Sequence, residues 1–169
     1  MGIVYDRDEQ MEGWLGSDFA GDKMTPMSTF GFTFILHGGA ISWRSRQQRL
    51  VATPTAAAKY VAAAEGFKDR LWLRRLLNDL GEYAGPVTLH EDNQVCIAMA
   101  TNEGMSPRTK HVDVCYHLIR DCVEKQQVVL AHVPTAEQLA DGFTKALPRD
   151  AFTRFREGLG VKVVRRADS

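Results

Sequence analysis

Asp92 is the residue with the clearest chemical potential in this sequence, because it directly follows an apolar run and precedes two amide side chains. The run VTLHE predicts a buried strand, and the apolar residues after Gln94 predict a helix. In open α/β sheets ligands bind beyond the carboxyl ends of strands, where an acid beside a helix N-terminus can hold a cation or meet a phosphate chain. An Asp at this place can equally serve only as the helix N-cap. The chemistry therefore depends on which other acids the fold brings to Asp92.

Three strands are predicted before the first helix. Residues 11–18 alternate loosely, and TFGFTFIL places Phe30, Phe32 and Phe34 on one face of a strand. The HGG stretch predicts a turn, and AISWRSRQQ predicts the returning strand. These segments indicate a three-stranded meander.

Helices and strands alternate in the rest of the chain. Thr53 and Pro54 are typical of a helix start, and the helical pattern continues to Gly81. A short helix follows Asp92, another begins at Ser106, and VVLAHVP predicts the fifth strand. Further elements are expected from the capping box of Thr135 and Gln138, which opens a helix bearing Asp141, and from the amphipathic segment PRDAFTRFREGLG. The order βββαβααβα predicts an α/β fold with a five-stranded mixed sheet and helices on both faces.

Length and composition limit the number of domains and the classes of partner. With 169 residues, of which 44% are hydrophobic, we expect one domain over 1–160 and a frayed tail over 161–169. Lys plus Arg equal Asp plus Glu at 21 each, which excludes a global basic field for nucleic acid. The three cysteines lack paired metal-type spacing and fit a reduced, intracellular setting. No signal segment or long apolar run is visible, so we expect a soluble protein without a membrane span, in the cytoplasm or the nucleus.

Several stretches together resemble one family. The sequence resembles the ribonuclease H domain of copia-type retrotransposon polyproteins, in order from about residue 2 to residue 160. The stretches that carry the resemblance are AGDKMTPMSTFGFTFILHGGAISWRSRQQ, LWLRRLL, LHEDNQ, SPRTKHVDVCYHLIR and VPTAEQLADGFTKALPR. The resemblance implies the five-stranded ribonuclease H-like fold and hydrolysis of the RNA strand of RNA–DNA hybrids. It also implies two Mg²⁺ or Mn²⁺ ions about 4 Å apart, held by four carboxylates.

Two of those four carboxylates are missing from this chain. Where the family reads roughly GYSDADWAGD this sequence reads GWLGSDFAGD, which puts Gly16 at the first catalytic acid and keeps Asp18 two residues later. Where the family reads STTEAEY this sequence reads PTAAAKY, which puts Lys59 at the second. Asp92 and Asp141 match the acids of the family's CDN and ADxxTK motifs.

These substitutions change the charge of the site. The side chains at the four positions go from about −4 to about −1, which leaves two Mg²⁺ ions almost unscreened. Our hypothesis is that Lys59 stands in for a metal ion and neutralises Asp92, Asp141 or both. Asp18, on the same face as Gly16, is a possible substitute acid for weak activity with a single metal ion.

Nucleic-acid binding could outlast cleavage. Asn93 and Gln94 match residues that the resemblance places at the minor groove of a hybrid, and they can equally cap the helix. Arg44 with Arg46, and Arg108 with Lys110, are candidate phosphate contacts, although solvated faces are the commoner role. A further basic group, Arg70, Arg74 and Arg75, is also expected on a solvated helix face.

Three functions follow as alternatives. The first is a degenerate ribonuclease H domain, captured or decayed from a retrotransposon, that retains binding of RNA–DNA hybrid or other duplex nucleic acid. The second is an active hybrid endonuclease with a rearranged metal site. The third is a protein-interaction module on a vestigial scaffold, which the zero net charge favours over a tight nucleic-acid binder.

Overall fold

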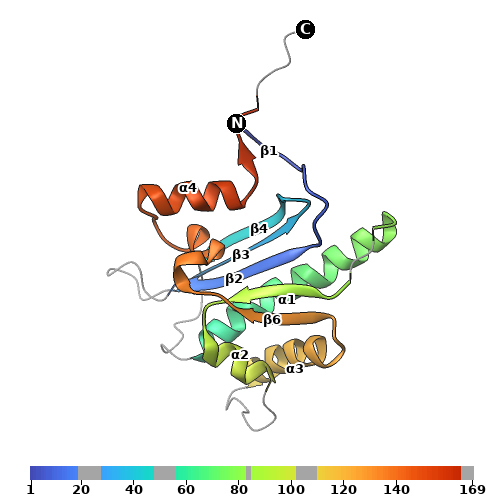
Figure 1. Ribbon diagram of the computed structural model, residues 1–169. Coiled ribbons are helices and arrows are strands. Elements are labelled where there is room, and N and C mark those ends of the chain that lie inside the picture. The colour runs from blue at the N-terminus through green and yellow to red at the C-terminus, as the bar shows by residue number, and fades with distance from the viewer. Residues whose placement is uncertain (19–27, 48–55, 83–84, 102–109, 165–169) are drawn as a thin grey trace.

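A five-stranded mixed sheet forms the centre of the molecule (Figure 1). The computed structural model describes residues 1–18, 28–47, 56–82, 85–101 and 110–164, with the backbone alone for 56–62 and 110–113. The sheet has the order β4-β3-β2-β5-β6. Its strands are β2 (Glu12–Asp18), β3 (Thr29–Leu36), β4 (Gly39–Gln47), β5 (Val87–Glu91) and β6 (Val128–His132). Strands β2 to β4 are antiparallel, and β5 runs parallel to both β2 and β6, which confirms the predicted mixed sheet.

The meander follows from alternation and from one turn. Phe30, Phe32 and Phe34 are all buried, as expected for residues that share the core face of a strand. His37 and Gly38 have φ values of 52° and 79°, so the two-residue loop between β3 and β4 has the left-handed backbone that tight hairpins require. The turn predicted at HGG is therefore confirmed.

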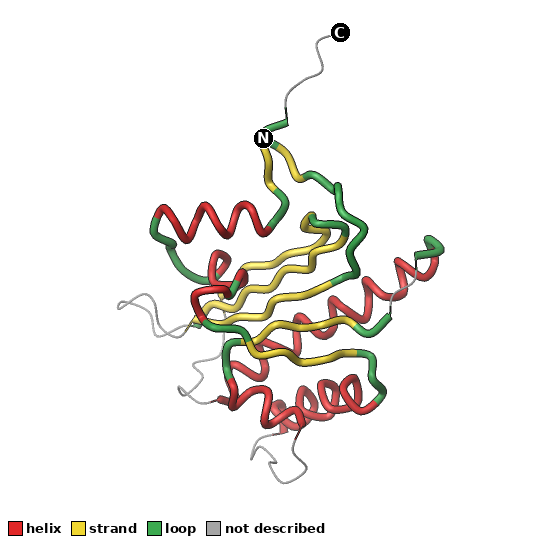
Figure 2. The backbone as a smooth tube through the Cα atoms, in the orientation of Figure 1, coloured by secondary structure: helices red, strands yellow, loops and turns green. Residues whose placement is uncertain are grey.

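Helices α1 (Ala56–Asp79), α2 (Gln94–Thr101) and α3 (Lys110–Glu124) cover the core face of the sheet (Figures 1 and 2). Gly66 lets α1 lie close to β2, because a Cβ atom there would come 2.3 Å from Leu15 Cδ2. Phe67 of α1 and Ile119 of α3 are each 1% exposed, so these helices share one apolar core with the sheet.

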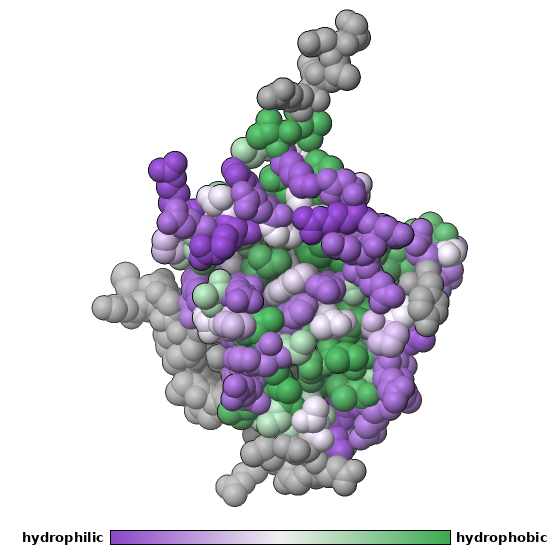
Figure 3. All heavy atoms as spheres, viewed as in Figure 1, coloured by the Kyte–Doolittle hydropathy of each residue, from purple (hydrophilic) through white to green (hydrophobic). Residues whose placement is uncertain are grey.

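The opposite face is covered by η1 (Thr135–Glu137), η2 (Leu139–Phe143) and α4 (Arg149–Gly158). The predicted capping-box helix is wrong: the segment forms two short 3₁₀ turns, and the N-cap of the first is Pro134, without a side-chain cap. The Thr135 hydroxyl bonds Asp92, whereas the Gln138 side chain bonds the Leu15 carbonyl and caps η2 at the Ala140 N–H, so the two residues do not cap each other. This covering is partial, and apolar surface is visible between polar residues in Figure 3.

The two ends of the described chain lie together. β1 (Gly2–Ile3) pairs antiparallel with β7 (Val161–Lys162), beside α4 in Figure 2. Lys162 Nζ is 2.5 Å from Asp6 Oδ2, which adds an exposed ion pair to this small ladder. The strand pairing thus includes the first residues of the segment expected to be a frayed tail.

The prediction that Arg70 lies on a solvated helix face is wrong. Arg70 is 0% exposed, so it does not belong to a solvated basic face with Arg74 and Arg75. Its Nη1 donates to Gln127 Oε1 at 3.2 Å and its Nη2 to the Gln127 carbonyl, which ties α1 to the start of β6. Burial, and next the charge of Arg74, lower the pKa of the Arg70 guanidinium.

One cysteine and the helices bear on the expectations for thiol chemistry and for a membrane span. Cys122 is 1% exposed and packs in the core, and burial raises the pKa of its thiol. None of the helices in the described ranges is long and apolar enough to cross a membrane.

Candidate active site

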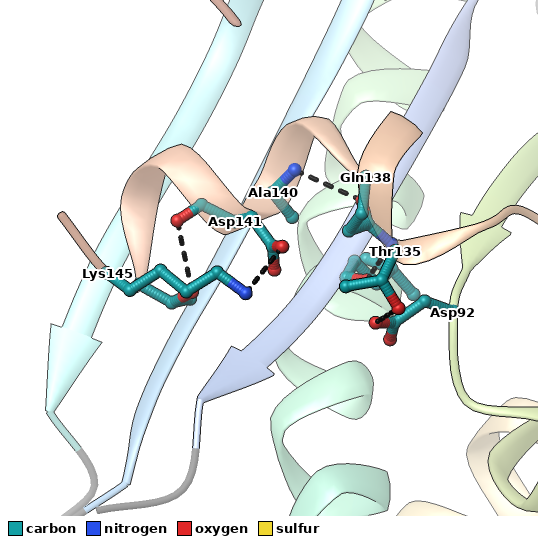
Figure 4. Close-up of polar contacts among 8 residues, drawn as sticks. Asp92, Thr135, Gln138, Ala140, Asp141 and Lys145 are labelled. Carbon is teal, nitrogen blue, oxygen red and sulfur yellow. Dashed lines mark hydrogen bonds and ion pairs between the residues drawn. The ribbon is translucent and has the colours of Figure 1, made fainter. Parts of the chain in front are cut away.

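The retained acids come from two elements at one end of the sheet. Asp92 directly follows β5, and Asp141 lies on η2, which packs over β2 (Figure 4). Because β2 and β5 are parallel neighbours, the strand positions around Gly16 and Asp92 belong to the same edge region. The two carboxylates have different partners, however, and the close-up shows them turned toward different residues.

Gly16 lies directly beneath η2. It is buried and is the register partner of Gly31 on β3, so the two glycines form a flat patch on the sheet. A Cβ atom at Gly16 would come 2.9 Å from Ala140 Cβ, and one at Gly31 would come 2.6 Å from Phe143 Cβ. Real Cβ contacts are longer, so any side chain at either position requires η2 to move away. η2 therefore packs against the strand position to which the family resemblance assigns the first acid.

Polar bonds fix η2 on that patch. Gln138 is 5% exposed, its Nε2 donates to the Leu15 carbonyl at 3.0 Å, and its Oε1 accepts from the Ala140 N–H at 3.1 Å. Ser45 Oγ of β4 donates to the Phe143 carbonyl at 2.6 Å. Both ends of η2 are thus bonded to the sheet, and the backbone that carries Asp141 has a defined position.

Lys145 is a site residue that the sequence reasoning did not single out. Its Nζ lies 2.6 Å from Asp141 Oδ2, in a pair whose side chains are 38% and 15% exposed. The backbone N–H of Lys145 also donates to the Asp141 carbonyl at 3.1 Å. The spacing of four residues within ADGFTK was the available signal, because side chains four apart on a helical turn face each other.

Asp92 is bonded to a hydroxyl and does not cap α2. Thr135 is the first residue of η1, and its Oγ1 donates to Asp92 Oδ2 at 3.1 Å. The cap is Asn93, whose Oδ1 accepts from the N–H groups of Val95 at 3.0 Å and Cys96 at 3.3 Å. Glu91, 5% exposed, accepts from the Asn93 N–H at 3.1 Å. Its register partner is the core residue Leu15, so Glu91 lies on the core side of the sheet.

Lys59 and Asp18 are the two remaining candidate site residues. Lys59 lies in the first turns of α1, and its side chain is outside the described residues, so its pairing with the aspartates stays a prediction. Asp18 ends β2, half-buried, on the face of Gly16. In the described ranges no three His, Cys, Asp or Glu side chains are grouped so that they could hold a metal ion.

The candidate nucleic-acid residues do not form one described surface. Arg44 Nη1 is 3.9 Å from Glu65 Oε2, and its Cζ is 5.6 Å from the Phe32 ring centroid, so it packs against the α1 side of β4. Arg46 and Gln94 are exposed, whereas the Asn93 side-chain oxygen accepts from the first N–H groups of α2 and caps that helix. Arg108 and the side chain of Lys110 lie outside the described residues.

Comparison with known proteins relates the chain to transposon polyproteins. It is 38% identical over 91% of its length to the retrovirus-related Pol polyprotein from transposon TNT 1-94 of Nicotiana tabacum, and covers 12% of that protein. It is 34% identical over 89% of its length to the corresponding protein from transposon RE1 of Arabidopsis thaliana, and covers 10% of it. The chain thus spans about a tenth of the length of these relatives. No protein-family model matches it.

Comparison of structures identifies the fold. The crystal structure of LC11-RNase H1 in complex with RNA/DNA hybrid superposes with a TM-score of 0.59 at 14% sequence identity, over 80% of this chain and 94% of that one. At this identity the likeness concerns the fold, which is that of ribonuclease H.

Proposed function

Since the chain is a homologue of retrovirus-related transposon Pol polyproteins with a ribonuclease H fold, we propose that it has lost two-metal cleavage and retains binding of RNA–DNA hybrid. The proposal rests chiefly on the packing at Gly16, where Ala140 occupies the space that a catalytic carboxylate would need. The family resemblance supplies the comparison, because it assigns an acid to this strand position.

Charge supports the loss of cleavage. Gly16, Lys59, Asp92 and Asp141 together carry a charge of about −1, and the ion pair with Lys145 brings the local sum to about 0. Two divalent cations held side by side need several carboxylates to screen them, and Mg²⁺ gives up its water ligands reluctantly. The oxygen ligands that remain for a metal ion are the carboxylates of Asp92 and Asp141, of which the first accepts from a hydroxyl and the second pairs with an ammonium group. These donors do not fit a two-metal centre.

Hybrid binding depends on different features and can persist without the metal ions. LC11-RNase H1, which shares the fold, was crystallised with an RNA/DNA hybrid. Hybrids are bound largely through shape and backbone contacts, which need no metal ligands. On this chain the exposed side chains of Gln94 and Arg46 are the described candidates for such contacts. We place the binding surface at the carboxyl ends of β2 and β5, beside Asp92.

Cleavage and binding can be measured separately on the purified chain. Cleavage of a labelled RNA–DNA hybrid in Mg²⁺ or Mn²⁺ should be no faster than with Asp92→Asn, the matched control that removes a retained carboxylate. Binding, followed by fluorescence anisotropy, should be tighter for hybrid than for duplex DNA and should weaken steeply as salt rises. Metal-dependent cleavage that disappears in Asp92→Asn would instead establish an active endonuclease. Equal, salt-insensitive binding of all duplexes would reject the retained binding surface.

A further inference from the structure

An exposed apolar stripe runs along the C-terminal half of α1 and continues to Leu80, which directly follows the helix and donates its N–H to the Leu76 carbonyl at 3.0 Å. Trp72, Leu76 and Leu80 are 56%, 38% and 69% exposed, although all three are large and hydrophobic. Residues four apart on a helix are offset by only about 40°, so the three side chains form one continuous stripe about 12 Å long. Leu73 and Leu77, one position further along, are buried in the core. The stripe is therefore a second apolar face that the core does not use.

The surroundings leave this face open to another helix. The C-terminal end of α1 extends past the ends of the neighbouring strands, so that its side is not enclosed by the sheet (Figures 1 and 2). Such stripes on soluble domains usually mark a contact with another protein surface.

The charges beside the stripe indicate what that surface is. Arg75 and Asp79 lie along the same border of the stripe, four residues apart, and both are exposed. Neither makes an ion pair with another residue in the described ranges of the chain. When two copies of α1 lie antiparallel about a twofold axis, the same border of each helix meets the other. Arg75 then faces Asp79 of the second copy, and Asp79 faces its Arg75.

The apolar residues match in the same arrangement. With the axis near Leu76, Trp72 of one copy lies over Leu80 of the other, and the two Leu76 side chains meet. We propose that this chain forms an antiparallel homodimer through Trp72 and Leu76 of α1 and Leu80 directly after it, with two reciprocal Arg75–Asp79 pairs. This inference is independent of the proposed loss of cleavage.

The size of the contact sets the expected affinity. Three apolar side chains from each copy make a smaller interface than that of typical stable complexes. We therefore expect a weak dimer with a Kd on the order of 100 µM, which is populated at high local concentration.

Complementary charge reversals provide a sharp test. Arg75→Asp makes the border wholly acidic and Asp79→Arg makes it wholly basic, so each variant alone replaces two attractions with two repulsions. Sedimentation of the full chain from about 10 µM to about 1 mM should show dimerisation weakened about tenfold in each variant. An equimolar mixture should dimerise at least as well as the unmodified chain, because each acidic border then meets a basic one.

Controls separate the interface from the fold. Both positions are exposed, so circular dichroism and the melting temperature should be unchanged, and Leu76→Asp should abolish dimerisation at every concentration. A chain that stays monomeric at about 1 mM would overturn the proposal and leave the stripe to a different protein. It would equally be overturned if the mixture associated no better than the separate variants.

Discussion

The core face of the sheet and the candidate site at the carboxyl ends of β2 and β5 differ in how much of the expected sequence pattern they keep. On the α1 side, Phe32, Phe34 and Leu89 are each at most 1% exposed, and they belong to one apolar core between the sheet and the helices. At the carboxyl end of β2 and β5, two of the four acids that the family resemblance assigns are absent, and Gly16 fills one place. Folding depends on burying apolar area, whereas carboxylates held close together repel each other and contribute nothing to the core. The fold can therefore persist while the acid cluster is lost.

The largest expected effect is on the core side. Phe34→Ala should lower the free energy of unfolding by about 3–5 kcal/mol, because Phe34 is 0% exposed and its ring lies 5.8 Å from that of Phe32. Chemical denaturation measures this. Val129→Ala, at a residue 52% exposed on β6, is the matched control and should cost less than about 0.5 kcal/mol. Similar losses for both variants would mean that the core face is not packed more tightly than the exposed positions of the sheet.

The packing of η2 on Gly16 gives a second test. Gly16→Ala should destabilise the protein by about 1–3 kcal/mol, since the added methyl group meets Ala140 Cβ at 2.9 Å. Ala140→Gly in the same chain should recover much of that loss, giving a favourable coupling of about 1 kcal/mol in a double-mutant cycle. Denaturant unfolding of the four proteins provides the measurement. Additive effects would mean that η2 does not rest on the strand at this point.

Restoring the acids tests the charge argument at the site itself. Gly16→Asp alone should leave Mn²⁺ binding negligible, because Lys59 remains and η2 is displaced. Gly16→Asp with Lys59→Glu should tighten Mn²⁺ binding at least about tenfold, measured by calorimetry, because it returns about three negative charges to the site. Asp92→Asn on that double variant is the control and should remove the gain. No gain in the double variant would show that the geometry of η2, rather than charge, prevents metal binding.

The sequence predicted most of the fold because the relevant signals are local. The alternating phenylalanines and the His37–Gly38 turn define β3 and β4, and the apolar run before Asp92 defines β5. Contacts between residues far apart in the chain could not be predicted from the sequence. Arg70 has a charged side chain, which usually stays at the surface, yet its guanidinium is buried against the Gln127 carbonyl, 57 positions away in the sequence.

The candidate site was predicted in part for the same reason. The positions of Asp92 and Asp141 follow from motifs, whereas their partners depend on how η1 and η2 fold. A capping box at Thr135 and Gln138 was a reasonable local interpretation, but tertiary bonds to Asp92 and to the Leu15 carbonyl replaced it. The closeness of Ala140 to Gly16 depends on packing between residues more than a hundred positions apart, which a single sequence does not reveal.

The smallest expected effect concerns Lys145 and decides whether its pair with Asp141 has a structural role. Lys145→Met keeps most of the side-chain length and removes the ammonium that lies 2.6 Å from Asp141 Oδ2. Because partly exposed pairs four residues apart contribute little, the free energy of unfolding should fall by only about 0.3–0.5 kcal/mol. Lys125→Met is the matched control, since it removes a pair of the same spacing, Lys125–Asp121 at 2.8 Å, whose side chains are both more exposed. If Lys145→Met cost much more than this control, the ammonium would be holding η2 on the sheet. Near-equal costs would mean that Gln138, Ser45 and the two glycines position η2, and that Lys145 mainly neutralises Asp141.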